Sequence, residues 1–203
     1  MSYSKYNVAI IPTENISQLS RKVSSRLGSD VYFHLNSVDI FPHLSLYHVP
    51  LEQAVVKEVC IILESAIQSI PIFTITGKEY YCYLGGWVGI SYEKNSELLA
   101  LENYVLHSLK NLWCRDFASE YEDVSGEKGK NIQEYGWADA GLRFFPHITL
   151  SRMKKDEYEE VIAVLNAHQI SEWSFCVERV GLFELDEHGT CTKLLQTFDL
   201  KTI

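Results

Sequence analysis

The sequence lacks several features that would assign it to a specialised class of protein. Its 203 residues contain no CxxC pair, and its five cysteines, an odd number, are scattered at 60, 82, 114, 176 and 191. This usage is typical of a reduced protein with free thiols and argues against disulfides or a structural zinc site. No apolar run approaches the roughly 18 residues that a membrane helix needs, and the N-terminal MSYSKYNVAIIP has no signal-peptide pattern. We therefore expect a cytoplasmic protein without a membrane partner.

Positive charge is also scarce. Lys and Arg number 18 against 27 Asp and Glu, which gives a formal net charge of −9. A surface of that sign repels phosphate backbones, so long, nonspecific nucleic acid is excluded as a partner. A local cluster of Arg and His can still hold a small anion, which leaves a small nucleotide or a short oligonucleotide end as candidate partners.

The apolar pattern predicts an α+β chain. Spacings of three and four indicate helices over 14–27, 51–69, 96–113 and 155–168. Strands are expected over 6–11, 31–35, 39–48, 141–151, 173–185 and 192–200, with two more in 72–92 that turn near Gly77 and a turn at 186–189. Both halves place a motif strand before a helix and two further strands. We expect a single domain over 1–203 with two pseudo-symmetric lobes, about 1–92 and 93–203, which can exchange strands. Each lobe would be a mainly antiparallel sheet with helices on its outer face, and the two would face a central cleft.

One stretch has no apolar period. Residues 116–134 hold six acids, two bases and two glycines. This composition predicts a mobile loop, either a lid or a surface insertion.

Two short motifs carry the chemistry. FPHLSL at 41–46 and FPHITL at 145–150 share Phe, Pro, His and the final Leu. Side chains alternate along a strand, so His43 and Ser45 lie on one face of the first motif. In the same way, His147 and Thr149 lie on one face of the second motif. The aliphatic residues between them would pack into the core. Each strand then presents an imidazole and a hydroxyl to the space between the lobes.

Paired imidazoles suit transfer at a phosphodiester. A neutral imidazole can accept the proton of an attacking water or hydroxyl, while an imidazolium donates one to the leaving oxygen. The unperturbed histidine pKa of about 6.5 fits both tasks. The hydroxyls of Ser45 and Thr149 can donate to phosphoryl oxygens as charge develops there. This scheme needs neither a cofactor nor a metal.

These motifs resemble the two-histidine phosphoesterase superfamily, which includes proteins called 2′-5′ RNA ligase-like and cyclic nucleotide phosphodiesterases. Its signature is two copies of His-x-Thr/Ser on strands of pseudo-symmetric lobes, and FPHLSLYHV and FPHITLSRM match it. The closing VERVGLFELDEHGTCTKLLQTFDL also resembles the terminal hairpin of that family. The resemblance implies a phosphodiesterase with His43, Ser45, His147 and Thr149 as catalytic residues. Ser45 stands where threonine is commoner, and the 116–134 segment has no counterpart in the family pattern.

Residues around the motifs are candidates for substrate binding. A strand that begins near 141 would place Arg143 on the face of His147, while Arg152 needs a bulge to reach that face. Strict alternation puts Tyr47 with His43 and leaves His48 on the opposite face. Tyr83 and Trp87 are candidate platforms for a base. The remaining histidines are interpreted as structural: His34, His107, His168 and His188.

The sequence favours an enzyme that hydrolyses a small cyclic nucleotide, a 2′-5′ linkage or an RNA-end phosphodiester. A nucleotide-binding module without turnover is an alternative, because the same fold and pocket would serve it. A metal-dependent hydrolase that uses His43, His147 and unidentified acids is a further alternative. The sequence assigns neither histidine as the base.

Overall fold

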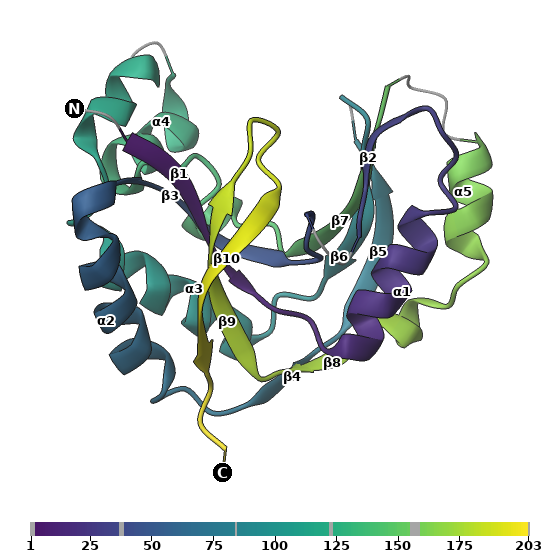
Figure 1. Cartoon of the computed structure of the whole chain (residues 1–203), viewed down its shortest axis with the longest axis horizontal. Helices are drawn as coiled ribbons and strands as arrows, with labels where there is room; N and C mark the ends of the chain where they lie inside the picture. Colours follow the sequence, from purple (N-terminus) through teal and green to yellow (C-terminus); the bar gives the residue numbers. More distant parts are fainter. Residues whose placement is uncertain (1–2, 37–38, 84, 122–123, 155–158, 203) are drawn as a thin grey trace.

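The computed structural model describes residues 3–36, 39–83, 85–121, 124–154 and 159–202. It has the α+β architecture predicted from the sequence, with helices packed outside a large, mainly antiparallel sheet (Figure 1). The strands are β1 (Tyr3–Ile10), β2 (Val31–His34), β3 (Leu44–Glu52), β4 (Phe73–Ile75), β5 (Gly77–Cys82), β6 (Trp87–Tyr92), β7 (His147–Met153), β8 (Phe175–Val177), β9 (Arg179–Leu185) and β10 (Cys191–Asp199). The helices are α1 (Glu14–Ser24), α2 (Val56–Ile67), α3 (Ser96–Leu109), α4 (Gly126–Tyr135) and α5 (Glu159–Asn166). Short 3-10 turns are η1 (Gln53–Val55), η2 (Arg115–Tyr121), η3 (Gly141–Arg143) and η4 (Ile170–Trp173).

The two motif strands are neighbours at the centre of the sheet. The strand order is β10-β9-β1-β3-β7-β6-β5, with β2 also paired to β7. Strands β3 and β7 run antiparallel and pair Leu44 with Ile148, the residues between each histidine and its hydroxyl. In an antiparallel register, this pairing sets Ser45 toward His147 and His43 toward Thr149. Neighbouring strands lie only about 4.8 Å apart, so the fold brings the two motifs together.

The central pair also divides the sheet into two lobes. Strands β10, β9, β1 and β3 form one lobe, beside α2 and α3, and β7, β6, β5 and β2 form the other, beside α1 and α5 (Figure 1). Each lobe therefore takes strands from both halves of the sequence. The two groups of strands do not correspond to residues 1–92 and 93–203, and the single domain over 1–203 stays a prediction.

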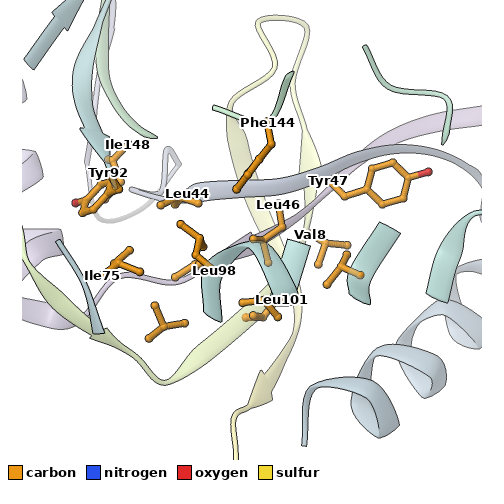
Figure 2. Close-up of a cluster of buried hydrophobic side chains, with 14 of the residues drawn as sticks. Val8, Leu44, Leu46, Tyr47, Ile75, Tyr92, Leu98, Leu101, Phe144 and Ile148 are labelled. Carbon is orange, nitrogen blue, oxygen red and sulfur yellow. The ribbon is translucent and has the colours of Figure 1, made fainter. Parts of the chain in front are cut away.

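The core lies under the motif strands. Leu44, Leu46, Ile148 and Leu150 are each 0% exposed. Figure 2 shows three of them, Leu44, Leu46 and Ile148, in one cluster with Leu98 and Leu101 of α3. Burial of such a side chain contributes about 1.5–3 kcal/mol. This packing holds the alternate residues of both motifs on the opposite face.

Both motif strands carry a β-bulge directly after the hydroxyl. On β3, Ser45 pairs with Ala9 and Tyr47 with Val8, so Leu46 is an extra residue. On β7, the pairing with β6 jumps in the same way, which makes Leu150 the extra residue. A bulge places two residues opposite one and reverses the alternation of faces beyond it. The two motifs are thus alike in backbone as well as in sequence.

The acidic stretch 116–134 is not the irregular loop that its composition predicts. Within its described part, η2 ends at Tyr121 and α4 runs from Gly126 to Tyr135. Ile132 is buried, and the Asn131 side-chain amide donates to the carbonyl oxygens of Ala138 and Ala140, at 3.1 and 2.8 Å. Two such residues are too few to produce a helical repeat of apolar positions in the sequence. The helix forms because they contact residues outside the segment.

Several element boundaries also differ from the prediction. The strand expected over 141–151 begins at His147, because Gly141 has a positive φ of 58° and 141–143 turns as η3. The region 72–92 holds three strands, with Gly77 opening β5 and the turn between β5 and β6 near Gly86. The predicted strand 173–185 divides into β8 and β9. Residues 155–158 of the predicted last helix lie outside the described residues, and α5 covers 159–166.

The remaining predicted elements end within a few residues of those observed. Predicted helix 51–69 begins as the end of β3 and η1, and α2 follows. Predicted strand 39–48 begins later, at Leu44, after Pro42, which has no N–H for a ladder. The turn at 186–189 is present, and the Gly189 N–H donates to the Asp186 carbonyl at 3.1 Å.

Candidate active site

A cavity of about 660 Å³ opens over the central strand pair. All four motif residues with polar side chains line it: His43 and Ser45 from β3 and the segment before it, and His147 and Thr149 from β7. The other lining residues are His48, Tyr81, Tyr83, Trp87, Trp137, Asp139, Arg143, Phe145, His188 and Gly189. Ligand pockets commonly have volumes of about 300–1,000 Å³, so this cavity has room for a nucleotide.

Both imidazoles are held by the same local contact. His43 Nδ1 lies 2.8 Å from the Phe41 carbonyl oxygen, and His147 Nδ1 lies 2.6 Å from the Phe145 carbonyl oxygen. A carbonyl only accepts, so Nδ1 must carry the proton in each ring. The neutral imidazole then has its lone pair on Nε2, which is the nitrogen left for the cavity. The Phe-Pro-His tripeptide therefore orients both bases in the same way.

The hydroxyls are held by different partners. Ser45 Oγ accepts from Asn7 Nδ2 at 2.8 Å and lies 3.1 Å from His48 Nε2. On the other motif, Thr149 Oγ1 lies 3.2 Å from the Tyr81 hydroxyl. Tyr81 reaches it from β5 across Gly89 of β6, where a Cβ would clash with the tyrosine. Each hydroxyl is thus held at the cavity by a side chain from another strand, Asn7 of β1 for Ser45 and Tyr81 of β5 for Thr149.

Burial keeps the histidines neutral near physiological pH. Burial lowers the pKa of His43 to about 4, a hydrogen bond to the Phe41 carbonyl opposes the shift, and His147 adds to it. Burial also lowers the pKa of His147, but both the Phe145 carbonyl and the nearby Asp139 carboxylate oppose this shift. A charge that favours the imidazolium therefore faces His147. The two otherwise similar histidines differ in this respect.

His48 lines the cavity and Tyr47 does not, which is the opposite of the faces that strict alternation predicts. The bulge at Leu46 changes the face, so His48 lines the cavity while Tyr47 is 0% exposed in the core (Figure 2). The Tyr47 hydroxyl donates to the Tyr135 carbonyl, and burial raises its pKa. His48 stacks on Trp137 with ring centroids 5.2 Å apart and an interplanar angle of 16°. Tyr47 is consequently part of the support under α4.

The two arginines take different places. Arg143 lines the cavity from η3, not from a strand, and its guanidinium donates to Asp139 at 3.1 and 3.2 Å. Arg152 follows the bulge at Leu150 and donates from Nε to the Gly85 carbonyl at 3.0 Å. Its guanidinium lies 4.9 Å from the Trp87 ring centroid, outside the residues that line the cavity. Arg152 thus contacts Trp87, its partner across strands β6 and β7, without lining the cavity.

One wall of the cavity carries the two aromatic residues predicted for substrate binding. Trp87 and Tyr83 both line the cavity, and Tyr83 is half-exposed. Tyr83 stacks on Tyr81 with centroids 4.8 Å apart, and Phe145 stacks on His147 at 5.1 Å. Exposed aromatic faces beside a polar site suit the stacking of a base.

Sequence reasoning missed Asn7, which contacts Ser45, and three residues that line the cavity. Asn7 is a polar residue inside the apolar run YNVAII, which is a signal that could have indicated a contact to the site. Trp137 and Asp139 follow the segment 116–134 that was interpreted as a loop, and His188 comes from the hairpin turn. Only tertiary structure brings these residues to the cavity.

Other kinds of site were also considered. Over the described ranges, no three His, Cys, Asp or Glu side chains are grouped as metal ligands would be. No helix in that part of the chain combines the length and apolar character needed to cross a bilayer.

Comparisons with known proteins define the fold. No model of a protein family matches the sequence, and no curated protein matches it. Solved structures do match over nearly the whole chain. E. coli LigT in its apo form has a TM-score of 0.61 at 15% identity and covers 99% of both chains. The E. coli LigT complex with 3′-AMP has a TM-score of 0.60 at 17% identity and covers 98% of this chain and 99% of that one.

A third structure, TT0787 of Thermus thermophilus, has a TM-score of 0.61 at 15% identity and covers 98% of each chain. Identities this low establish the fold alone. The chain therefore has the fold of LigT.

Proposed function

We propose that this protein is a metal-independent phosphodiesterase that hydrolyses a small cyclic nucleotide, a 2′-5′ linked nucleotide or an RNA-end phosphodiester. One observation carries the proposal. Two imidazoles, each with Nδ1 bound to the carbonyl two residues earlier, line one cavity together with Ser45 and Thr149. This is the arrangement that general acid–base catalysis at a phosphorus atom requires.

In the proposed reaction, His43 is the base and His147 the acid. His43 Nε2 accepts a proton from water as the water oxygen forms a bond to phosphorus. The bond from phosphorus to the leaving oxygen breaks, and that oxygen receives a proton from the His147 imidazolium. Asp139 supports this assignment, because its carboxylate favours the protonated form of His147. The protons then exchange with solvent, which restores both histidines.

The other lining groups would stabilise and position the substrate. Ser45 and Thr149 would donate hydrogen bonds to the non-bridging phosphoryl oxygens, whose negative charge grows in the transition state. Trp87 and Tyr83 would stack against a base. Arg143 would bind the phosphoryl group or hold Asp139 in place. Arg152 would hold the Trp87 ring in position through the contact of its guanidinium with that ring.

Ligands in structurally similar proteins support a nucleotide substrate. E. coli LigT has been crystallised with phosphate and with 3′-AMP. Both ligands carry the phosphoryl group that the proposed chemistry needs, and 3′-AMP adds a base.

The test is a panel of 2′,3′-cyclic, 3′,5′-cyclic and 2′-5′ linked nucleotides incubated with the protein in EDTA. Hydrolysis should persist in EDTA and fall about 10²–10⁴-fold in both His43→Ala and His147→Ala. His107→Ala, which removes an exposed histidine of α3, is the matched control. Saturable binding without product would instead indicate a nucleotide-binding module. Loss of activity in EDTA would indicate a metal-dependent hydrolase.

The pH profile tests the assignment of roles. The value of kcat/KM should fall below about pH 4, where His43 becomes protonated in the free protein. It should also fall on the alkaline side at a pH below 6.5, because the pKa of His147 is lowered. The anionic substrate raises the pKa of the acid in the complex, so the alkaline limb of kcat should lie at higher pH. A profile that is flat between pH 5 and 9 would contradict the two-histidine scheme.

A further inference from the structure

A second cavity adjoins the first. It has a volume of about 340 Å³ and shares His48, Trp137, His188 and Gly189 with the cavity over the motifs. The stacked pair of His48 and Trp137 therefore forms a wall common to both. The two cavities thus adjoin along these two rings.

The far side of the second cavity combines positive charge with aromatic surface. Lys5 of β1 places its ammonium 5.5 Å from the ring centroid of Phe117, whose ring lies 4.9 Å from that of Tyr121. Among the residues that the structure describes, none forms an ion pair with Lys5. Two carboxylates line this cavity: Asp186 accepts from the Thr190 backbone and hydroxyl within its own turn, and Glu187 Oε1 lies 3.7 Å from His188 Nε2. Lys5 is thus the strong cation at this end of the cavity.

The charge of Lys5 also extends to the shared wall. It lowers the pKa of His48, after the larger effects of burial and of His43 and His147. His48 thus lines both cavities, with His43 and His147 in the first and Lys5 in the second.

We propose that the second cavity binds the next nucleotide of a linear substrate, with its base against the Trp137 side and its phosphate at Lys5. This inference rests on the proposed function and narrows its substrate class. The preferred substrate is then a dinucleotide or short oligonucleotide end, not a cyclic mononucleotide. A single lysine within a chain of net charge −9 suits a short anion and not a long one.

Lys5, Phe117 and Tyr121 lie beyond the paired motifs. Phe117 and Tyr121 belong to η2, at the start of the segment without a counterpart in the family pattern. The second cavity is consequently lined by residues outside FPHLSL and FPHITL.

The experiment compares two probes on the wild-type chain and on Lys5→Gln. The probes are 3′-AMP, which fills one cavity, and a 2′-5′ linked adenylate dinucleotide with a phosphate at each end, which extends into both. Binding is measured by calorimetry in the His43→Ala/His147→Ala background, so that neither probe is turned over. Lys57→Gln is the matched control, because it removes one positive charge from α2, away from both cavities.

In Lys5→Gln, the affinity for the dinucleotide should fall about tenfold relative to that for 3′-AMP, the scale expected for one lost charge-assisted phosphate contact. The slope of log K against log salt for the dinucleotide should also decrease by about 0.7. Lys57→Gln should change neither ratio nor slope. Tyr121→Leu, which removes an aromatic ring but no charge, should lower the ratio without changing the slope.

Equal affinities for the two probes, or equal effects of Lys5→Gln and Lys57→Gln, would overturn the inference. The proposed function fails by a different result, namely the absence of hydrolysis of any probe by the wild-type protein. Binding is scored without turnover, so the two failures remain distinct.

Discussion

Acidification offers a direct test of how the cavity holds His48. Burial, followed by the charges of His43, His147 and Lys5, lowers the pKa of His48 to about 3 in the folded protein. The same side chain has a pKa of about 6.5 in the unfolded chain. Between these values the unfolded state binds a proton that the folded state does not. The stabilising contribution is therefore complete above pH 6.5 and is lost as the pH falls toward 3.

The size of the effect follows from the difference between the two pKa values. At pH 4.5 an unfolded His48 is almost fully protonated while the folded one remains neutral. The unfolded state then gains about 2.5 kcal/mol relative to pH 7, at 1.36 kcal/mol for each pH unit below 6.5. This is an upper limit, because His48 lines a cavity that water enters and solvent reduces the penalty on its charge.

The assay is urea denaturation of the wild-type protein and His48→Gln at pH 7 and pH 4.5. Gln has no titrating group, and its amide can still donate to Ser45 Oγ. Wild type should lose up to about 2.5 kcal/mol more free energy of unfolding than His48→Gln over this pH interval. His107→Gln controls for the removal of one histidine from the exposed surface of α3. Equal losses in wild type and His48→Gln would refute the conclusion that the folded protein holds His48 neutral.

Three further substitutions test the support around the site. Gly89→Ala should destabilise the protein by about 1–3 kcal/mol, measured by thermal denaturation, because its Cβ would clash with the Ile148 carbonyl and the Tyr81 hydroxyl; an unchanged midpoint would contradict this. Tyr81→Phe should lower kcat more than it raises KM, because it frees Thr149 Oγ1 while retaining the ring packing; a change in KM alone would indicate a role in binding only. Burial raises the pKa of Glu102, so its carboxyl group binds a proton more tightly in the folded protein than in the unfolded chain. The free energy of unfolding therefore falls as the pH rises above about 4.3, the pKa of a glutamate in the unfolded chain. Glu102→Gln should remove this decline in denaturation curves between pH 4 and 7, and an identical pH dependence in both proteins would show that the carboxylate is not responsible.

The alternation of side chains along a strand was sufficient to predict which residues of each motif face the core and which face the cavity. In FPHLSL and FPHITL it separated the buried Leu44 and Ile148 from the residues that line the cavity. It also predicted that two distant segments share one site, since each presents an imidazole and a hydroxyl. Local sequence contained this information because both strands are covered by core on one face.

The same rule was wrong one residue further along. Tyr47 and His48 exchange faces because Leu46 is extra with respect to its partner strand β1. A bulge is a property of the pairing between strands, so the sequence of β3 alone does not show it. Arg152 illustrates the same limit. Its predicted place depended on a bulge, and the bulge at Leu150 is visible only in the pairing of β7 with β6.

Non-local contacts also explain why α4 was missed. Its helix is held by Ile132 in the core, by Asn131 bonds to the following loop, and by Gly136 in a left-handed conformation at its C-terminus. An acidic segment with such sparse anchors has the composition of a loop. Trp137 and Asp139 follow this helix, so the cavity residues that they supply were missed with it.

The junction between the lobes has a mechanical consequence. Strands β3 and β7 are joined by the single residue pair Leu44 and Ile148, whereas the pairs on either side of them are extensive ladders. Each imidazole is therefore carried by the ladder of its own lobe, while one backbone rung and the core packed beneath it join the two. A substitution that shifts Leu44 against Ile148 would change the gap between the imidazoles without altering the carbonyl contact that orients each ring.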